Sequence, residues 1–458
     1  MSKKELFKEF SEVSAKEWKQ KIQFDLKGAD YNEALIWESP EGIKVKPFYN
    51  SDDVTDKIEN FTVTPEWNIG QPIFVQNETA SNLKALDSLE RGAEDLVFTI
   101  SSAQIKIDSL LKSIPLKDKT IYFYFQFISA TYIKNLIEYC RDKDVTIHLN
   151  IDIIGHLAKT GNWYSTLNQD HKELDAIVAQ TKNNPLLHTI GIDLSTYQNA
   201  GATMAQQLGY AMAHANEYLN HFKNSSIPKI TFTVSISGNY FFEIAKLRAL
   251  RLLWNTLAEE YNTDGNCTII ATPSKRNKTL YDYNVNMLRT TTECMSASLG
   301  GANTICNLAY DAIYHKDNEF GERISRNQLL ILKKESYFDR VTNPADGAYY
   351  IESITHQLAE KALELFKSIE AKGGFLSNLK SHNIQKKIKE SALKEQELFH
   401  TKKEILVGTN KYQNPSDRIK GDIELYPFVK TNARKTLLVP IIEKRLAEEL
   451  EQNRLQDE

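Results

Sequence analysis

The chain has 458 residues, of which 41% are hydrophobic and 25% charged, and its formal net charge is -4. This length predicts either one large α/β domain with appendages or two to three domains. The composition excludes an intrinsically disordered chain. The small net charge gives no electrostatic reason to expect nucleic acid or an acidic membrane surface as a partner.

The sequence predicts neither a targeting segment nor a membrane span. Met1–Glu9 contains no apolar run of the kind a signal peptide needs, and no stretch approaches the ~20 apolar residues of a span. Four cysteines lie far apart, without a Cys-x-x-Cys pair: Cys140, Cys267, Cys294 and Cys306. We expect buried thiols rather than disulfides or a zinc site, and therefore a reducing cytoplasm.

Residues 1–70 predict an arm or linker more than a compact domain. Glu17–Leu26 has the apolar spacing of a short amphipathic helix. Glu41–Tyr49 has the pattern of extended chain, and the prolines and the acidic pair Asp52 and Asp53 are typical of a linker.

From residue 71 to residue 320, short apolar or β-branched runs alternate with helical patterns, which favours a parallel sheet with crossover connections. The runs are Ile73–Gln76, Leu96–Ser101, Ile121–Phe127, Thr146–Asp152, Thr189–Leu194, Ile230–Ile236, Cys267–Thr272 and Thr304–Leu308. Eight βα units over about 250 residues predict a closed (β/α)8 TIM barrel. The competitor, an open doubly wound sheet, usually has a glycine-rich turn after its first strand, where this chain has Gln76–Thr79.

Residues 321–458 predict a C-terminal helical extension. Three polar helices are expected over Gly321–Glu335, Ile354–Ala371 and Asn383–Phe399. Gly373 and Gly374 follow the second of them, as a C-terminal cap would. The charged tail, Lys430–Glu458, is expected to be helical, either as a solvated last helix or as a linker to another domain or to a partner.

Active sites of TIM barrels lie at the carboxyl ends of the strands. The sharpest such end is the sixth predicted strand, which breaks at Ser237-Gly238 and continues directly into a helix. Asn239 and Tyr240 follow the break and point over the barrel. Both can form hydrogen bonds, but neither readily exchanges protons near neutral pH.

Six short segments share the pattern of a known family and occur in its order. They are Lys16–Trp18, Glu41–Pro47, Asn199–Ala202, Phe320–Asn327 with Glu335–Ser336, Asn343–Glu352 and Val407–Tyr412. Together they resemble the adenosylcobalamin-dependent methylmalonyl-CoA mutases along nearly the whole chain.

The departures from this family concern its catalytic residues. Catalytic members carry Ser-Gly-Tyr-His-Met-Gln-Glu after the sixth strand, so Asn239 stands for the tyrosine and Tyr240 for the histidine. After the eighth strand, Cys306 replaces a second histidine of the family's Ser-Leu-His-Thr-Asn. The catalytic Arg-Gln-Tyr-Ala-Gly stretch has no counterpart around Trp67–Gln71. The resemblance therefore implies a chain with degenerate catalytic positions.

The family's cobalamin-binding domain, with its Asp-x-His-x-x-Gly motif, is also missing from this sequence. Single histidines are scattered through the barrel region at positions His148, His156, His188 and His214, and we expect none to be a ligand or base. We expect no cofactor and no metal bound by this chain. Adenosylcobalamin is expected in a partner subunit.

The third predicted strand, Ile121–Phe127, is bulky on both faces because Tyr, Phe and Gln alternate along it. In the catalytic family an acyl-CoA arm threads along the barrel axis between small side chains. Bulky inward side chains therefore predict a packed axis without a tunnel.

Three functions are compatible with the sequence. The leading hypothesis is the small, non-catalytic subunit of a heterodimeric methylmalonyl-CoA mutase, which stabilises the large catalytic subunit through its N-terminal arm and C-terminal helices. The second is the substrate-binding half of a split mutase that works with a separate cobalamin-domain protein. The third is an unrelated TIM-barrel enzyme that uses acids at strand ends, such as Asp152, Asp193 and Glu243.

Overall fold

The computed structural model describes residues 9–11, 13–53, 66–430 and 433–458. Most of Met1–Glu9, on which the prediction of no signal peptide rests, lies outside the described residues. Within the described part, no helix is both long enough and apolar enough to cross a membrane.

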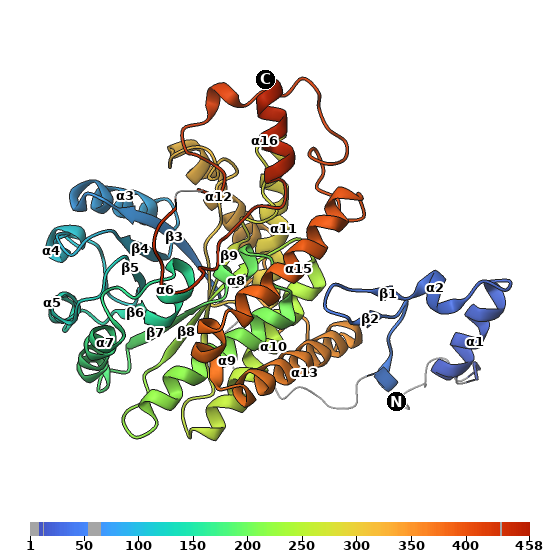
Figure 1. Ribbon diagram of the computed structural model, residues 1–458, viewed down its shortest axis with the longest axis horizontal. Helices are drawn as coiled ribbons and strands as arrows, with labels where there is room; N and C mark the ends of the chain where they lie inside the picture. Colours follow the sequence, from blue (N-terminus) through green and yellow to red (C-terminus); the bar gives the residue numbers. More distant parts are fainter. Residues whose placement is uncertain (1–8, 12, 54–65, 431–432) are drawn as a thin grey trace, which may run out of the picture.

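Eight parallel strands close into a barrel in the order β10-β3-β4-β5-β6-β7-β8-β9 (Figure 1). Their bounds are β3 Asn68–Val75, β4 Asp95–Ile100, β5 Thr120–Phe125, β6 Thr146–Ile151, β7 Leu187–Asp193, β8 Ile230–Ile236, β9 Thr268–Pro273 and β10 Thr304–Ile305. The TIM-barrel prediction is confirmed at all eight strands. The open-sheet alternative is wrong, because β10 pairs with both β3 and β9.

Helices connect the strands and cover the outside of the barrel (Figure 1). They are α3 Glu78–Glu90, α4 Ile107–Leu110, α5 Ala130–Cys140, α6 Ile153–Thr160, α7 Leu167–Thr181, α8 Ser195–Asn199, α9 Met204–Phe222, α10 Tyr240–Glu260 and α11 Val285–Leu299. Side chains at the helix starts accept hydrogen bonds from first-turn amides, which fixes where these helices begin. The capping residues are Asn77, Ser129, Asp152, Thr166 and Thr203.

Two tyrosines on β5 cross the barrel axis. The Tyr122 hydroxyl lies 2.8 Å from the hydroxyl of Thr304 on β10, and the Tyr124 hydroxyl lies 2.7 Å from that of Thr233 on β8. Val97, Tyr122, Ile270 and Cys306 form a separate apolar cluster inside the barrel, against which Tyr124 packs. The inward set of β5 is therefore bulky, as predicted, and fills the axis at this level.

Gly70 on β3 allows this filling. A Cβ atom at Gly70 would lie 2.5 Å from Cys306 Sγ and 2.8 Å from Thr304 Cγ2, closer than real side chains approach. Glycine is therefore required here because the neighbouring strand β10 and the residue after it place two larger side chains, Thr304 and Cys306, against this position.

The N-terminal arm, residues 9–11 and 13–53, projects from the barrel (Figure 1). It contains α1 Ala15–Asp25, α2 Tyr31–Leu35, the antiparallel pair β1 Trp37–Glu38 and β2 Lys44–Val45, and a 3-10 turn at Ser51–Asp53. The arm is fastened by Glu41, whose carboxylate accepts the backbone amides of Met204 (2.9 Å) and Ala205 (3.0 Å) at the start of α9. A carboxylate at a helix N-terminus is favoured by the helix dipole.

The C-terminal extension contains the three predicted helices. They are α12 Glu319–Leu330, which continues as a π-helix over Ile331–Glu335, α13 Tyr349–Ala371 and α15 Asn383–His400. The structure adds α14 Gly374–Lys380 and a 3-10 turn at Lys420–Asp422. Gly373 has a φ of +94°, which confirms a left-handed residue after α13.

Helix α13 packs along α9 and α10. A Cβ atom at Gly209 of α9 would lie 3.0 Å from the carbonyl oxygen of Ala362 in α13, so the two helices approach each other closely.

The predicted helical tail is wrong over most of its length. Only α16, Glu448–Asp457, is helical, and residues 433–447 run as an extended segment that we call the C-terminal strap. Pro440 and its β-branched neighbours explain this, because proline interrupts the helical hydrogen bonds. The interpretation as a solvated helix is also wrong at Glu451, which is fully buried and accepts the backbone amide of Leu280 at 2.7 Å. Residues 431–432 lie outside the described residues.

We predict that Gly70→Ala lowers the free energy of unfolding by about 1–3 kcal/mol, because the added methyl overpacks the barrel axis. Adding Cys306→Ala should recover part of this loss, since it removes the nearest clashing atom. The measurement is chemical denaturation of the two single variants and the double variant. Gly421→Ala, where nothing lies within 4 Å of the added Cβ, is the control. Strict additivity in the double variant would contradict the contact.

Candidate functional site

The turn after β8 is held by a residue of the helix that follows it. The Oε1 atom of Glu243 accepts the backbone amide of Ser237 at 2.9 Å and its hydroxyl at 2.6 Å. The Glu243 amide in turn donates to the carbonyl oxygen of Asn239 at 2.9 Å. These bonds tie the end of β8 to the first turn of α10.

Lys246 forms an ion pair with Glu243. Its ammonium lies 2.6 Å from Glu243 Oε2, and both side chains are fully buried. Lys246 also donates to the carbonyl oxygen of Ser235 at 2.7 Å and to the amide oxygens of Gln198 and Gln207 at 3.2 Å each. Burial lowers the pKa of Lys246, and Glu243 opposes this change. Because the charges are paired and hydrogen-bonded, the pair is tolerated in the interior.

Asn239 and Tyr240 follow this turn. Among the described residues, no acid or base forms a hydrogen bond with either side chain. Asn239 is half-buried, and its side chain makes no capping hydrogen bond to α10. Tyr240 is half-buried beside Phe241, with 5.3 Å between ring centroids. Burial raises the pKa of Tyr240 above its ordinary value near 10, so its phenol stays protonated at neutral pH.

Cys306 does not join the turn. It is 1% exposed and packs inside the barrel with Val97, Tyr122 and Ile270, whereas Tyr240 packs against the larger core between strands and helices. Burial raises the pKa of the Cys306 thiol well above its usual range. A thiol kept protonated in this way is a packing group rather than a nucleophile.

Two of the single histidines meet inside the barrel, which the sequence analysis missed. His148 and His188 occupy paired positions of β6 and β7, and their rings stack with centroids 4.1 Å apart. His148 Nδ1 lies 2.6 Å from the hydroxyl of Thr231, and its other face stacks on Tyr122 at 4.4 Å. Burial lowers the pKa of His188 to about 4 and that of His148 well below its ordinary value. The stack is therefore neutral at pH 7.

The other two histidines have structural contacts. His156 stacks on Tyr164 with centroids 3.6 Å apart, and burial lowers its pKa to about 4. His214 lies with Nε2 2.9 Å from Asp152 Oδ1, and the same carboxylate oxygen accepts the amide of Gly155 at 2.7 Å. Asp152 is thereby engaged as the N-terminal cap of α6.

Asp193 and Glu243, the other two acids of the unrelated-enzyme hypothesis, are engaged in the same way. Asp193 accepts the backbone amide and the hydroxyl of Ser195 at the start of α8. Burial raises the pKa of Asp193, and nearby Lys159 opposes this. Among the described residues, no group of three or more His, Cys, Asp or Glu side chains is placed to hold a metal ion.

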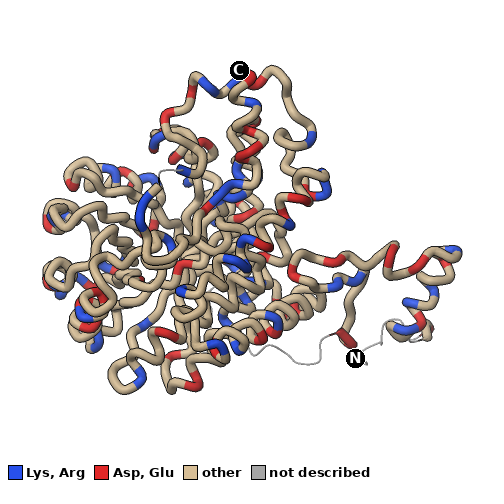
Figure 2. Tube along the Cα trace, in the orientation of Figure 1, with Lys and Arg blue, Asp and Glu red and all other residues tan. Residues whose placement is uncertain are grey.

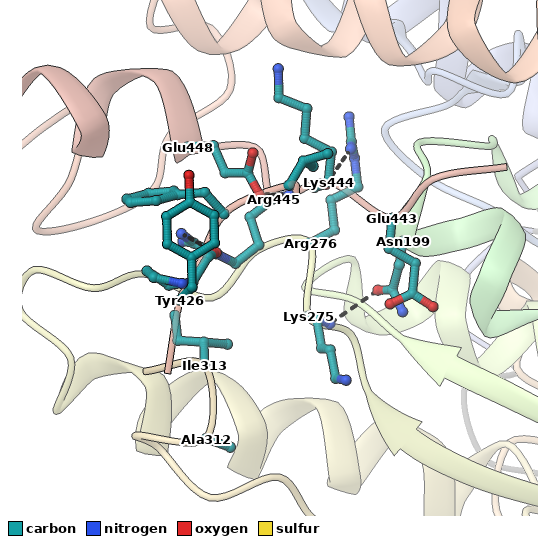
Figure 3. A pocket seen from close by; sticks show the side chains of 13 residues that line it. Asn199, Lys275, Arg276, Ala312, Ile313, Tyr426, Glu443, Lys444, Arg445 and Glu448 are labelled. Atoms are coloured by element: carbon teal, nitrogen blue, oxygen red, sulfur yellow. Dashed lines mark hydrogen bonds between the residues drawn. The ribbon is translucent and has the colours of Figure 1, made fainter. Parts of the chain in front are cut away.

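A pocket of about 210 Å³ lies beside the C-terminal strap, at the carboxyl end of the barrel. Its lining comes from the loops after β9 and β10, from residues 426–429 and from the strap (Figure 3). Ligand pockets usually measure about 300–1,000 Å³. Lys275 and Lys444 point away from each other (Figure 3), and the two arginines of the lining, Arg276 and Arg445, are paired with Glu395 and Glu451. Basic and acidic residues are interspersed over the rest of the molecule (Figure 2).

Comparison with known proteins decides the family. The sequence profile described as Methylmalonyl-CoA mutase matches residues 98–453. The chain belongs to the methylmalonyl-CoA mutase family. Over 453 residues it is 33% identical to a Porphyromonas gingivalis protein described as methylmalonyl-CoA mutase small subunit, covering 92% of this chain and 73% of that protein.

Two Streptomyces virginiae proteins of the methylmalonyl-CoA mutase family are also similar. The one described as small subunit is 28% identical, covering 90% of this chain and 72% of that protein. The one described as large subunit is 25% identical, covering 88% of this chain and 63% of that protein. The chain therefore spans nearly three quarters of the length of these small subunits and less than two thirds of that large subunit.

The histidine stack predicts a pH-dependent stability. His188 has a pKa of about 4 in the folded chain and about 6.5 when unfolded, so between these values the unfolded state binds more protons. Stability from this group is complete above pH 6.5 and is lost as the pH falls towards 4. His188→Phe should therefore flatten the decrease in Tm between pH 7 and pH 5, as measured by calorimetry. His171, half-buried on the outer helix α7, provides the control variant His171→Asn; equal slopes in all three proteins would refute the assignment.

Proposed function

We propose that this chain is the non-catalytic small subunit of a heterodimeric methylmalonyl-CoA mutase in the cytoplasm. Its partner is the large subunit, which binds adenosylcobalamin and interconverts methylmalonyl-CoA and succinyl-CoA. The observation that carries the proposal is the 33% identity to a protein described as the small subunit, across 92% of this chain. The existence of both a small-subunit and a large-subunit relative from one organism supports a two-chain assembly.

The absence of a proton-exchanging side chain on the β8 turn supports a non-catalytic role. Positioned acids and bases typically contribute roughly 10²–10⁴-fold to rate. Asn239 cannot supply this, and burial raises the pKa of Tyr240 further from neutrality. The residues present therefore do not fit the chemistry of an adenosylcobalamin site on this barrel, and we assign no step to this chain.

The packed barrel axis is a second argument for this role. Tyr122 and Tyr124 each reach a hydroxyl on a strand across the barrel. A thread-like acyl chain along the axis would have to displace both tyrosines together with Cys306. The split-mutase alternative needs a substrate path along this axis and is therefore less well supported.

The N-terminal arm supplies a surface for the large subunit. No residue of α1 is buried, and Phe10, Trp18 and Phe24 are 69%, 50% and 79% exposed. Aromatic side chains are enriched where subunits meet. Interfaces of permanent complexes commonly bury more than about 2,000 Å², and an arm that projects from the barrel adds such area.

The direct test is to purify the chain alone and together with a large subunit, and to follow succinyl-CoA formed from methylmalonyl-CoA with adenosylcobalamin present. We expect stable co-purification, and no turnover by the isolated chain. Turnover by this chain with only a free cobalamin-domain protein would overturn the proposal in favour of a split mutase. Tyr240→His, assayed alone, should remain inactive because the barrel axis stays filled.

The arm assignment is tested by Phe24→Ser. Truncation of a central aromatic contact commonly costs more than about 1–2 kcal/mol of binding, so the Kd for the large subunit should rise about tenfold, measured by calorimetry or surface plasmon resonance. The Tm of the isolated chain should not change, because Phe24 is exposed. Leu393→Ser on α15, 59% exposed, is the matched apolar control. An equal effect of both variants would argue against the arm as the specific contact.

A further inference from the structure

The C-terminal strap crosses the carboxyl end of the barrel on one side only. The backbone amides of Leu438 and Ile441 donate to carbonyl oxygens of Gly161 and Ala158, which lie after β6. The amide of Lys444 donates to Asn199, after β7, and that of Leu446 donates to Arg276, after β9. The strap therefore spans the rim from β6 to β9 (Figure 1).

Inward-pointing side chains differ in exposure between the two halves of this rim. On β3, which the strap does not cross, Pro72 is exposed and Phe74 is 43% exposed. In the half that the strap crosses, Ser235 at the end of β8 and Ser274 after β9 are 2% and 0% exposed, and Asp193 at the end of β7 is half-buried. The side chains at these strand ends are therefore more buried than those of β3.

One end of the strap is firmly anchored. Arg445 is 6% exposed and donates to Glu451 at 2.6 Å, to the carbonyl oxygen of Lys278 at 3.1 Å and to that of Pro427 at 3.2 Å. Arg276 also donates to the carbonyl oxygen of Lys444 at 2.7 Å. These buried, charge-assisted bonds fix residues 444–447 to the barrel.

The other half of the strap is held by hydrogen bonds to α6, to the turn after it and to Gln385, without a buried ion pair. Leu438 and Ile441 are buried, but Leu437, Val439 and Ile442 are 73%, 53% and 52% exposed. Glu443 lies 3.3 Å from Lys159 of α6, and both side chains keep contact with solvent. Half-exposed ion pairs of this kind contribute little and are screened by salt.

The strap passes so close to Gly161 that a side chain would not fit there. Gly161 has a φ of +79°, and a Cβ atom there would lie 2.6 Å from the carbonyl oxygen of Leu438. Gly347 has a similar φ of +76° with nothing within 4 Å, so it provides the same backbone strain without the contact.

We propose that residues 433–443 are a latch that closes the β6–β9 half of the barrel end, hinged at Arg445 and held at Gly161 and by the Glu443–Lys159 pair. Release of the latch uncovers the end of β7, where Asp193 lies within electrostatic reach of both Lys159 and Glu443. The device belongs to this chain alone and does not depend on the role as a small subunit.

The experiment combines hydrogen exchange with thiol labelling on the full chain. Ser195 follows Asp193 and is half-buried, so Ser195→Cys provides a thiol at the covered end of β7. All four native cysteines are buried, so they give a low background. We expect Gly161→Ala to raise both the exchange rate of residues 433–443 and the labelling rate of the introduced thiol about tenfold. Glu443→Gln should raise both rates about two- to fivefold.

The matched controls are Gly347→Ala for the glycine and Glu138→Gln, in an exposed ion pair on α5, for the carboxylate. Neither control should change the two rates. Faster exchange of the strap without faster labelling would show that it covers nothing and would overturn the proposal. So would equal rates in Gly161→Ala and Gly347→Ala. If Gly161→Ala fails to fold, the comparison of Glu443→Gln with Glu138→Gln still decides.

Discussion

Closure of the eight-stranded sheet is the constraint on which the rest of this structure depends. A closed barrel of eight strands leaves an interior that side chains must fill, and here two tyrosines of β5 fill it from one side. Their hydroxyls need partners inside the barrel and find them on Thr304 and Thr233. Gly70 then has to be small, since β10 returns with Cys306 at the same level. The same side chains therefore fill the barrel axis and satisfy the hydrogen bonds of its polar atoms.

The turn after β8 is fixed by residues other than the ones that it presents at the barrel end. Glu243 and Lys246 are buried and bind each other, and together they fix the backbone from Ser235 to Ser237. This support comes from residues that never face the barrel end. The side chains of Asn239 and Tyr240 take no part in the hydrogen bonds that Glu243 and Lys246 make to the turn. The residues that fix the position of the turn are therefore different from the residues whose side chains the turn presents.

Much of the fold could be predicted from the sequence because alternating strand and helix patterns are local signals. The eight strands and the three long helices of the C-terminal extension follow from the sequence pattern alone. The extended conformation of the strap was not predicted, because its charged sequence is typical of a solvated helix. Its actual conformation depends on contacts with the barrel rim. The π-helical end of α12 likewise has no local signal.

The candidate site was predictable in part. The position of the turn follows from the break at Gly238, but the histidine stack depends on register between β6 and β7, which one sequence does not reveal. His148 and His188 are 40 positions apart in the chain and directly opposite each other in the sheet. Engagement of Asp152 by His214 likewise needs the helix α9 to be placed.

The close approach of α13 to α9 at Gly209 has a consequence for how the chain holds together. A contact of this kind leaves no room between the two helices at this point for a side chain at position 209. The extension is therefore fitted to a helix of the barrel at close distance. Exchanging the extension between relatives would require a barrel whose α9 also carries a glycine where α13 crosses it.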